Sequence, residues 1–404
     1  MMSVGDVSSP TAQGQIVLRG SSAAGLALLA ISWLVTRSIL LAGTLSGIVP
    51  ADISAYERWA NLLRDGQAPA QDTAFVYPPG SLIIFLGGGS LGEFSYFRSF
   101  TILAIFADLV LLLALVAFAL RSGQGSMMGA WAWVVMGFAA GPLLVERYDV
   151  FAALLGAAAV LALSRPAVTG ALAGLGFLVK IWPEIAILGV PRQRMLRALG
   201  VNLVVIAVGW VLLQAIFGNS FGFVSNVLNK SVSVEAVVAY PFLVMRRLFG
   251  TFGVTGQFGS WEVTGPGVAA MGSVSTAVGL LALAFLLLLR YRGVFDHVPP
   301  GDIVLLGVLI FVATHKINSL QYGIWIAAMT AATLAYRTSR SMGPAALLIL
   351  MLIVTNDVIW AQFVPFISGN TFLLVFQGLR LGLLLSAGIW MALTMRRAPS
   401  GASM

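Results

Sequence analysis

Residues 102–120 read ILAIFADLVLLLALVAFAL, a run in which Asp108 is the single ionisable residue. A helix needs about 20 such residues to cross the hydrocarbon core of a bilayer, which is roughly 30 Å thick. Further apolar runs recur along the chain at Leu26–Leu41, Val274–Leu289 and Leu347–Val354. We therefore predict a protein that crosses a lipid bilayer many times.

The composition favours the same interpretation. Hydrophobic residues make up 59% of the 404 positions and charged residues only 9%, whereas a soluble domain has about 25% charged residues. A transmembrane β-barrel would need short segments of alternating polarity, but these runs are apolar on every face. The sequence predicts an all-α polytopic membrane protein of about twelve transmembrane helices. Residues 1–404 are expected to form one domain, in which the polar residues 1–20 are a cytoplasmic tail.

The charges argue against several functional classes. The formal net charge is +8, but the basic residues lie mostly at the ends of apolar runs. That distribution indicates membrane topology and not a nucleic-acid partner. The chain has no cysteine and two histidines, which excludes thiol chemistry and disfavours zinc or copper. We expect no cofactor and no metal, with Asp52 and Asp149 as the one carboxylate pair that could be considered.

The positive-inside rule orients the chain. Arginines mark the connections expected in the cytoplasm, namely Arg121, Arg165, Arg192, Arg194, Arg197, Arg290, Arg292, Arg337, Arg340, Arg396 and Arg397. Mixed or acidic segments are expected on the outer face, at 52–72, 146–149, 219–235, 257–262 and 314–319. Most of them fall in two long outer loops, 46–79 and 218–267. We expect the functional site on this extracytoplasmic side of the cell membrane.

Two apolar stretches are interrupted. Ser81–Leu91 is short and broken by glycines, and Gly170–Val190 is interrupted by Lys180 and Pro183. The second stretch must cross the membrane an even number of times, as two short helices. Irregular backbone at membrane depth is tolerated only where protein or a watery cavity covers it, so both breaks are expected to line a cavity. Lys180 also needs water or a partner, and Glu184, one helical turn away, is a candidate for a structural ion pair.

The first outer loop contains PADISAYERWANLLR at residues 50–64. Ile53–Arg64 has helical spacing, and Asp52 is placed as the N-cap of a helix lying on the outer surface of the membrane. The YPP sequence at 77–79 predicts an extended entry into the next helix. From the spacing alone, Asp52 either caps this helix or takes part in chemistry.

Four motifs in order along the chain carry a resemblance. They are the Asp52 loop ending in YPP, KIWP at 180–183, SVEA at 233–236 and NSLQYGIW at 318–325. Together they resemble polyprenyl-phosphate-sugar-dependent glycosyltransferases of the GT-C superfamily, most of all glycosyltransferase family 87, the actinobacterial α-1,2-mannosyltransferases. The sequence departs from the family pattern at Leu320, which replaces a proline, at Ala236, where serine is common, and at 146–149, which replaces a Gly-Gln-type element.

The resemblance implies a GT-C type bundle with a juxtamembrane helix in the first loop. It implies transfer of a hexose, mannose first, from a polyprenyl-phosphate sugar donor to a glycolipid or polysaccharide acceptor, with inversion and with Asp52 as general base. His315 and Lys316, at the outer end of an apolar run, are expected to bind the donor phosphate together with Lys180. The expected substrate contacts are Tyr56, Tyr77, Arg147, Asp149, Glu235, Gln321 and Tyr322.

Other interpretations remain open. Lys316 and the loop aromatics are also typical of interfacial anchors, and Arg147 with Asp149 fits a structural pair. Asp108 and Asp357 fit either a proton path or polar packing between helices. An arabinofuranosyltransferase would share the implied architecture, and a transporter or lipid flippase is the usual interpretation of many helices with intramembrane charges. The grouping of polar residues on outer loops argues against transport, and the presence of Asp52 argues against an inactive subunit of an envelope-synthesis complex.

Overall fold

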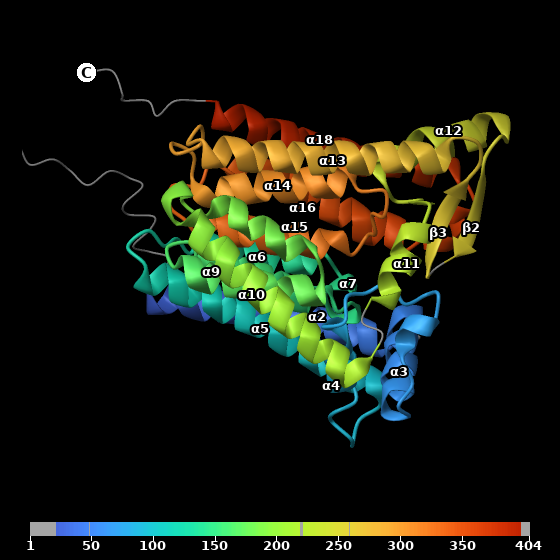
Figure 1. Cartoon of the computed structure of the whole chain (residues 1–404), viewed down its shortest axis with the longest axis horizontal. Helices are drawn as coiled ribbons and strands as arrows, with labels where there is room; N and C mark the ends of the chain where they lie inside the picture. The colour runs from blue at the N-terminus through green and yellow to red at the C-terminus, as the bar shows by residue number, and fades with distance from the viewer. Residues whose placement is uncertain (1–21, 48, 219–220, 258, 397–404) are drawn as a thin grey trace, which may run out of the picture.

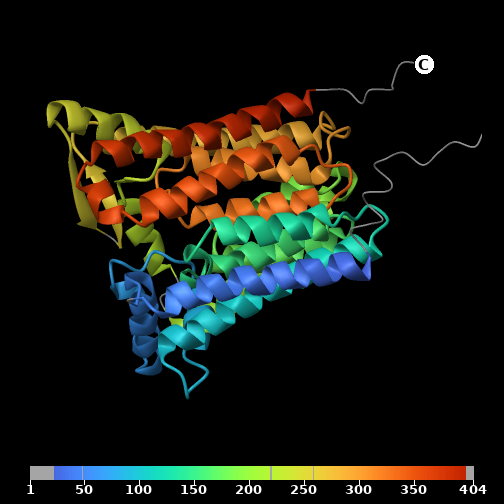
Figure 2. The same ribbon diagram turned by 180° about the vertical axis from the view of Figure 1, so that it is seen from behind.

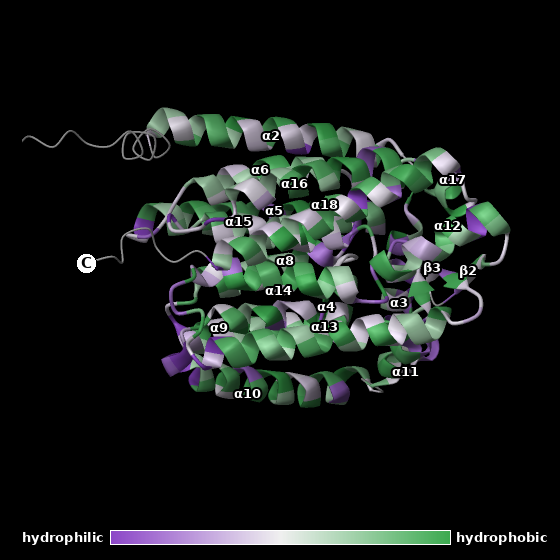
Figure 3. Ribbon diagram, turned by 90° about the horizontal axis from the view of Figure 1, so that it is seen from above, coloured by the Kyte–Doolittle hydropathy of each residue, from purple (hydrophilic) through white to green (hydrophobic). Residues whose placement is uncertain are grey.

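The computed structural model describes residues 22–396 apart from 48, 219–220 and 258, and it is a bundle of helices (Figure 1). Within these residues, six helices are long and apolar enough to cross a membrane. They are α2 (Ala23–Leu45), α5 (Tyr96–Arg121), α10 (Arg192–Phe217), α13 (Val268–Tyr291), α16 (Met342–Ile353) continued by η4 (Val354–Trp360), and α18 (Thr371–Met395). Figure 3 shows hydrophobic residues along these helices and hydrophilic ones toward the two ends of the bundle. The prediction of a polytopic helical membrane protein is confirmed.

The bundle also contains five shorter apolar helices. They are α6 (Met128–Ala139), α8 (Asp149–Leu161), α9 (Pro166–Val179), α14 (Pro300–Thr314) and α15 (Tyr322–Leu334). At 1.5 Å per residue they extend only about 18–23 Å, less than the ~30 Å core. The helix α15 is buried along its whole length and packs against α6, α8 and α14. The expected number of about twelve membrane crossings, which would include these short helices, remains a prediction.

The arginine-rich connections gather at one end of the bundle, as expected. Arg337 donates a hydrogen bond from Nε to the carbonyl oxygen of Gly125 at 2.6 Å. The guanidinium of Arg192 pairs with Asp296 at 3.1 Å, and Arg340 donates to the carbonyl oxygen of Thr394. These contacts join connections that lie far apart in the sequence. The expected cytoplasmic residues 1–20 and Arg397 lie outside the described residues.

The opposite end of the bundle carries the small elements, most of which belong to the expected outer loops (Figure 2). They are α3 (Ala51–Arg64), η1 (Pro69–Gln71), α4 (Ser81–Gly87), α7 (Leu143–Glu146), α11 (Gly222–Asn229), η3 (Val237–Ala239), α12 (Tyr240–Phe249) and α17 (Phe363–Ile367). The side-chain amide of Asn226 donates to the carbonyl oxygens of Asp72 and Phe75. The two long loops are thus bound to each other.

A small antiparallel sheet in the second long loop is absent from our sequence-based expectations. Its strands β1 (Val232–Ser233), β2 (Gly253–Gln257) and β3 (Ser260–Thr264) lie in the order β1-β3-β2. Val263 of β3 stands opposite Val232 of β1 and Val254 of β2. Strands this short carry too little alternation to be detected, and their pairing fixes where the segment after β1 runs.

The two interruptions have different structures. At Lys180, α9 ends and the 3₁₀ helix η2 (Trp182–Gly189) returns toward the arginine-rich end, so two short helices are present as expected, and their crossing of the membrane stays a prediction. The amide of Gly80 donates to the carbonyl oxygen of Leu178 at 2.8 Å, so the end of the first outer loop contacts the last turn of α9. The helix α4 is a short segment at the outer end that leads into α5.

Asp108 has a structural role. Its carboxylate accepts from Arg37 Nη2 at 2.9 Å and from Trp33 Nε1 at 2.6 Å. Arg37 also donates to the carbonyl oxygens of Trp133 and Val134, and both charged side chains are buried. Because this network joins α2, α5 and α6 and satisfies both charges, it supports the interpretation of Asp108 as polar packing.

Candidate active site

Asp52 lies in the first turn of α3, and its expected role as N-cap is wrong. The N-cap position belongs to Pro50, and no side chain caps this helix. The carboxylate of Asp52 instead forms an ion pair with the guanidinium of Arg147. The side chain of Asp52 is 31% exposed, whereas that of Arg147 is 4% exposed. The carboxylate of Asp52 is therefore partly accessible to a substrate and is paired with a buried cation.

Arg147 reaches Asp52 from the extended segment between α7 and α8. Its guanidinium lies over the ring of Trp360, 5.0 Å from the centroid, so a π face covers the cation. The proline at position 142 begins α7, and Arg147 ends it in an extended conformation. The 146–149 segment, which departs from the family pattern, thus supplies the partner of Asp52.

Asp149, Lys180 and Trp325 form a second group, beneath the first outer loop. Asp149 begins α8 and is fully buried. It accepts hydrogen bonds from Lys180 Nζ at 2.5 Å and from Trp325 Nε1 at 2.7 Å. The alternative pairing of Lys180 with Glu184 is wrong, because Glu184 accepts instead from Asn202 at 2.7 Å.

Aromatic rings surround the Lys180 ammonium. Its Nζ lies 4.6 Å from the ring centroid of Tyr148, 4.8 Å from that of Trp325, 5.4 Å from that of Tyr322 and 5.9 Å from that of Tyr77. Such rings attract a cation and exclude water. The break at Lys180 therefore places a desolvated positive charge at the ends of the short helices α8, α9 and α15.

The loop aromatics pack inside the protein. The ring of Tyr56 is fully buried and stacks on Phe85 at 4.5 Å between centroids. Tyr77 contacts Tyr148 edge to face at 5.0 Å. Tyr322 stacks on Trp325 at 3.6 Å, and Gln321 beside it accepts from the Ser319 hydroxyl. These contacts place Tyr77 and Tyr322 beside Lys180 and make Tyr56 a packing residue of α3.

His315 and Lys316 use their polar atoms to hold loops. The His315 ring stacks on Phe311, and its Nδ1 lies 2.6 Å from the carbonyl oxygen of Ile317. Lys316 Nζ donates to the carbonyl oxygens of Lys230 at 2.5 Å and Leu228 at 3.4 Å. Lys316 thus fastens the segment that follows α11.

Lys230 is a buried cation that our sequence reasoning missed. It lies between α11 and β1 and is 5% exposed. Burial lowers the pKa of Lys230 to about 8. The carboxylates of Glu262, Glu235 and Asp52 raise this pKa, and the Lys180 ammonium lowers it further. Asp52 and Lys180 are therefore near enough to interact with Lys230. A lone lysine in the second outer loop was the available signal.

Glu235 joins the cluster from the segment between β1 and η3. Burial raises the pKa of Glu235 to about 7, against the opposing effect of its own backbone amide, Arg380, Lys230 and Arg147. Its carbonyl oxygen accepts from Gln377 Nε2 and Arg380 Nη1, both at 3.1 Å. Arg380, an arginine inside the apolar helix α18, was also missed, although an intramembrane charge is by default a functional candidate.

Several buried polar atoms of this cluster have no hydrogen-bond partner in the described part of the chain. They include Oδ2 of Asp149, Oε2 of Glu235 and Nε of Arg380. Buried polar atoms are nearly always paired, so unpaired ones mark places where a ligand can bind. The arrangement joins one exposed carboxylate, several buried cations and free hydrogen-bonding atoms, which suits the binding of an anion beside a polar substrate.

Comparison with known proteins assigns the family. The pattern of glycosyltransferase family 87 matches residues 75–314, more than half of the chain. No curated protein matches the sequence. The matched part includes Arg147, Asp149, Lys180, Lys230 and Glu235 and begins after Asp52. This chain, a bundle of apolar helices with a charged cluster at one end, therefore belongs to glycosyltransferase family 87, a GT-C family, and is a multi-pass membrane glycosyltransferase.

Proposed function

We propose that this enzyme transfers a hexose, with mannose the first candidate, from a polyprenyl-phosphate sugar to a hydroxyl of an envelope glycolipid or polysaccharide. The observation that carries the proposal is the position of Asp52, which is partly exposed at the edge of a cluster of buried cations. Transfer from a phosphate needs a base for the acceptor's proton and positive charge for the leaving group. Asp52 and the cations supply these two requirements.

The reaction proceeds by one displacement. The acceptor oxygen attacks the anomeric carbon from the face opposite the phosphate, and Asp52 takes the proton of that hydroxyl. The bond between the anomeric carbon and the phosphate oxygen breaks, so polyprenyl phosphate leaves with the electron pair and the configuration inverts. The ion pair with Arg147 fixes the direction of the Asp52 carboxylate.

Lys180 and Lys230 bind the donor phosphate in this proposal. Both ammonium groups are largely removed from water, and a charge interaction is stronger where the surroundings are less polar. Lys316, another expected phosphate ligand, supports this site indirectly because it donates to the carbonyl oxygen of Lys230, whereas the ring of His315, the remaining one, contacts Phe311 and Ile317. We assign the binding of sugar hydroxyls to Asp149, Glu235 and Arg380, because each has a buried polar atom without a hydrogen-bond partner among the described residues.

We assign this end of the bundle to the outer face of the membrane. The arginine-rich connections lie at the other end, and such connections remain in the cytoplasm. A lipid-linked donor fits this side because it needs no soluble nucleotide. The active site would then open to the periplasm or its equivalent.

The test uses the purified enzyme in lipid nanodiscs with a panel of envelope lipids as acceptors. Radiolabelled polyprenyl-phosphate mannose and polyprenyl-phosphate arabinose are supplied in parallel, with a nucleotide sugar as a third donor. We expect a labelled lipid from the mannose donor, with the anomeric configuration inverted when the product is examined by NMR. Transfer from the arabinose donor alone would replace the sugar, and transfer from the nucleotide sugar alone would overturn the donor class.

A further inference from the structure

A separate cleft lies between α12 and the turn that joins α17 to α18. Its volume is about 700 Å³, and α12 lies at the same end of the bundle as α3 (Figure 1). Its lining includes Arg246, Arg247, Ser368, Asn370 and Thr371. Neither Asp52 nor any cation of the candidate active site lines it, so the cleft requires its own explanation.

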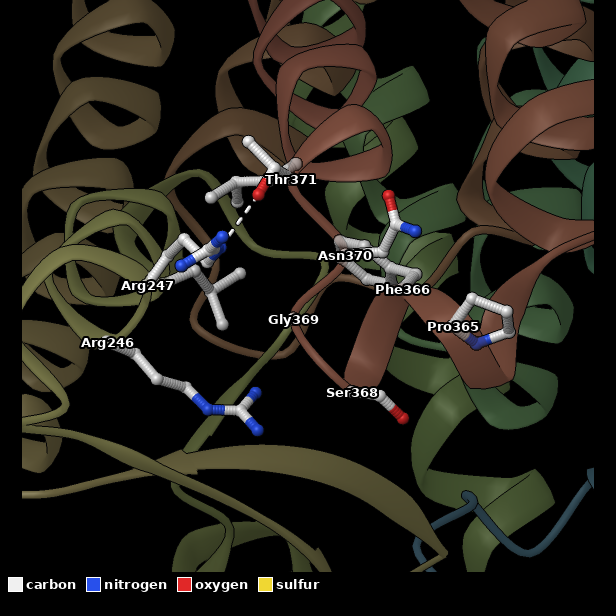
Figure 4. Close-up of a pocket in the computed structure, with 10 residues that line it drawn as sticks. Arg246, Arg247, Pro365, Phe366, Ser368, Gly369, Asn370 and Thr371 are labelled. Atoms are coloured by element: carbon white, nitrogen blue, oxygen red, sulfur yellow. Dashed lines mark hydrogen bonds between the residues drawn. The ribbon is translucent and has the colours of Figure 1, made fainter.

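Two consecutive arginines supply the charge of this cleft. Arg246 donates from Nη1 to the carbonyl oxygen of Ile367 at 2.8 Å, and Arg247 donates from Nε to Thr371 Oγ1 at 2.7 Å. Each guanidinium has five N–H donors, so most remain available after these bonds. Figure 4 shows both side chains extending from α12 across the cleft toward the α17–α18 turn.

The lining carries no compensating negative charge, since none of the described residues that form it is acidic. Two adjacent guanidinium groups without a carboxylate repel each other, and an anion between them would remove that repulsion. The planar guanidinium fork matches the oxygens of a phosphate group in a bidentate way. The charge and the shape therefore favour a phosphate-bearing ligand.

The surroundings of the cleft are apolar. Leu248 and Phe249, which follow the arginines, are 66% and 70% exposed, and Val364 and Phe372, on either side of the α17–α18 turn, are 69% and 60% exposed. Such side chains belong in lipid at the end of a membrane-spanning bundle. We infer that the cleft between α12 and α18 binds the phosphate group of an anionic membrane lipid, whose acyl chains lie against these four residues. This inference concerns binding and does not depend on the proposed sugar transfer.

The experiment compares lipid retention by native mass spectrometry of the full-length protein released from nanodiscs. The nanodiscs contain phosphatidylcholine with or without phosphatidylglycerol. The variant Arg246→Gln/Arg247→Gln removes the two charges of the cleft, and the single variant Arg247→Gln guards against poor folding. The matched control is Arg64→Gln/Arg98→Gln, which removes two exposed arginines from the same end of the bundle.

We expect the wild type and the control to retain phosphatidylglycerol in preference to phosphatidylcholine. The double variant should bind phosphatidylglycerol at least about tenfold more weakly, because charge-assisted hydrogen bonds are lost. A second arm adds inorganic phosphate to delipidated protein in detergent, where we expect no saturable binding at millimolar concentration. Equal retention by the double variant and the wild type, or saturable binding of free phosphate at the cleft, would overturn the lipid site.

Discussion

Asp52→Asn tests the role of Asp52 as general base, and because it also removes the anion that pairs with Arg147, thermal unfolding and donor binding show whether the site stays intact. Asp52→Asn keeps the shape of the side chain but cannot take the acceptor's proton, so sugar transfer should fall by at least ~10² while the donor still binds. Donor binding and transfer are to be measured on the same purified protein. The control is Glu57→Gln, which removes an exposed carboxylate from the same helix. Near-normal transfer by Asp52→Asn would remove Asp52 from the mechanism.

The buried ammonium of Lys230 predicts how kcat/KM for the donor depends on pH. Burial lowers its pKa to about 8, so the free enzyme loses this positive charge as the pH rises through 8. If the ammonium binds the donor phosphate, kcat/KM for the donor should fall between about pH 8 and 9.5, since this ratio reports the free enzyme. Lys230→Arg should shift that fall to higher pH, because arginine stays charged. The same decline in both proteins would show that another group titrates.

Among the elements, Lys316 holds the last turn of α11 and the segment that follows it through the carbonyl oxygens of Leu228 and Lys230. Lys316→Met removes these hydrogen bonds, so residues 228–236 should exchange amide hydrogens faster, and sugar transfer should fall because Lys230 loses its fixed position. Lys316→Gln, which can still donate one bond, should restore part of both. Slower transfer with unchanged exchange would instead indicate that Lys316 contacts the substrate.

The network of Arg37 and Asp108 that joins α2, α5 and α6 should affect stability and not sugar transfer. Asp108→Asn leaves the buried guanidinium of Arg37 without its anion, which typically costs about 3–5 kcal/mol. Replacing both residues, as in Arg37→Met/Asp108→Leu, should be less harmful because no charge is left unpaired. Thermal unfolding in detergent measures both variants. A double variant less stable than Asp108→Asn would contradict this account.

For the whole molecule, the sidedness can be measured directly because the chain has no native cysteine. Gln71 and Gln257 lie at the α3 end of the bundle and Gln193 at the arginine-rich end, all with exposed side chains. Cysteines at Gln71 and Gln257 should react with an impermeant thiol reagent on intact cells, whereas one at Gln193 should react only after permeabilisation. Labelling of Gln193→Cys in intact cells would place the candidate active site in the cytoplasm.

The class of the molecule, and the residues that share one end of it, could be predicted from the sequence. Apolar runs and flanking arginines are local features, and the bilayer imposes a helix on each run and an orientation on each flank. The order of four short motifs indicated the family that the comparison with known proteins confirmed. The helix in the first loop and the break at Lys180 are also local features, so the sequence predicts both within a few residues.

The tertiary structure decided which charges meet. Asp52 pairs with Arg147 and Lys180 with Asp149, across 95 and 31 positions, and no spacing rule connects residues so far apart. The nearby Glu184 was the better partner for Lys180 by sequence, but the turn at Pro183 directs it toward Asn202 instead. The sequence offered only a weak signal for Lys230 and Arg380, because their burial and their charged neighbours result from packing.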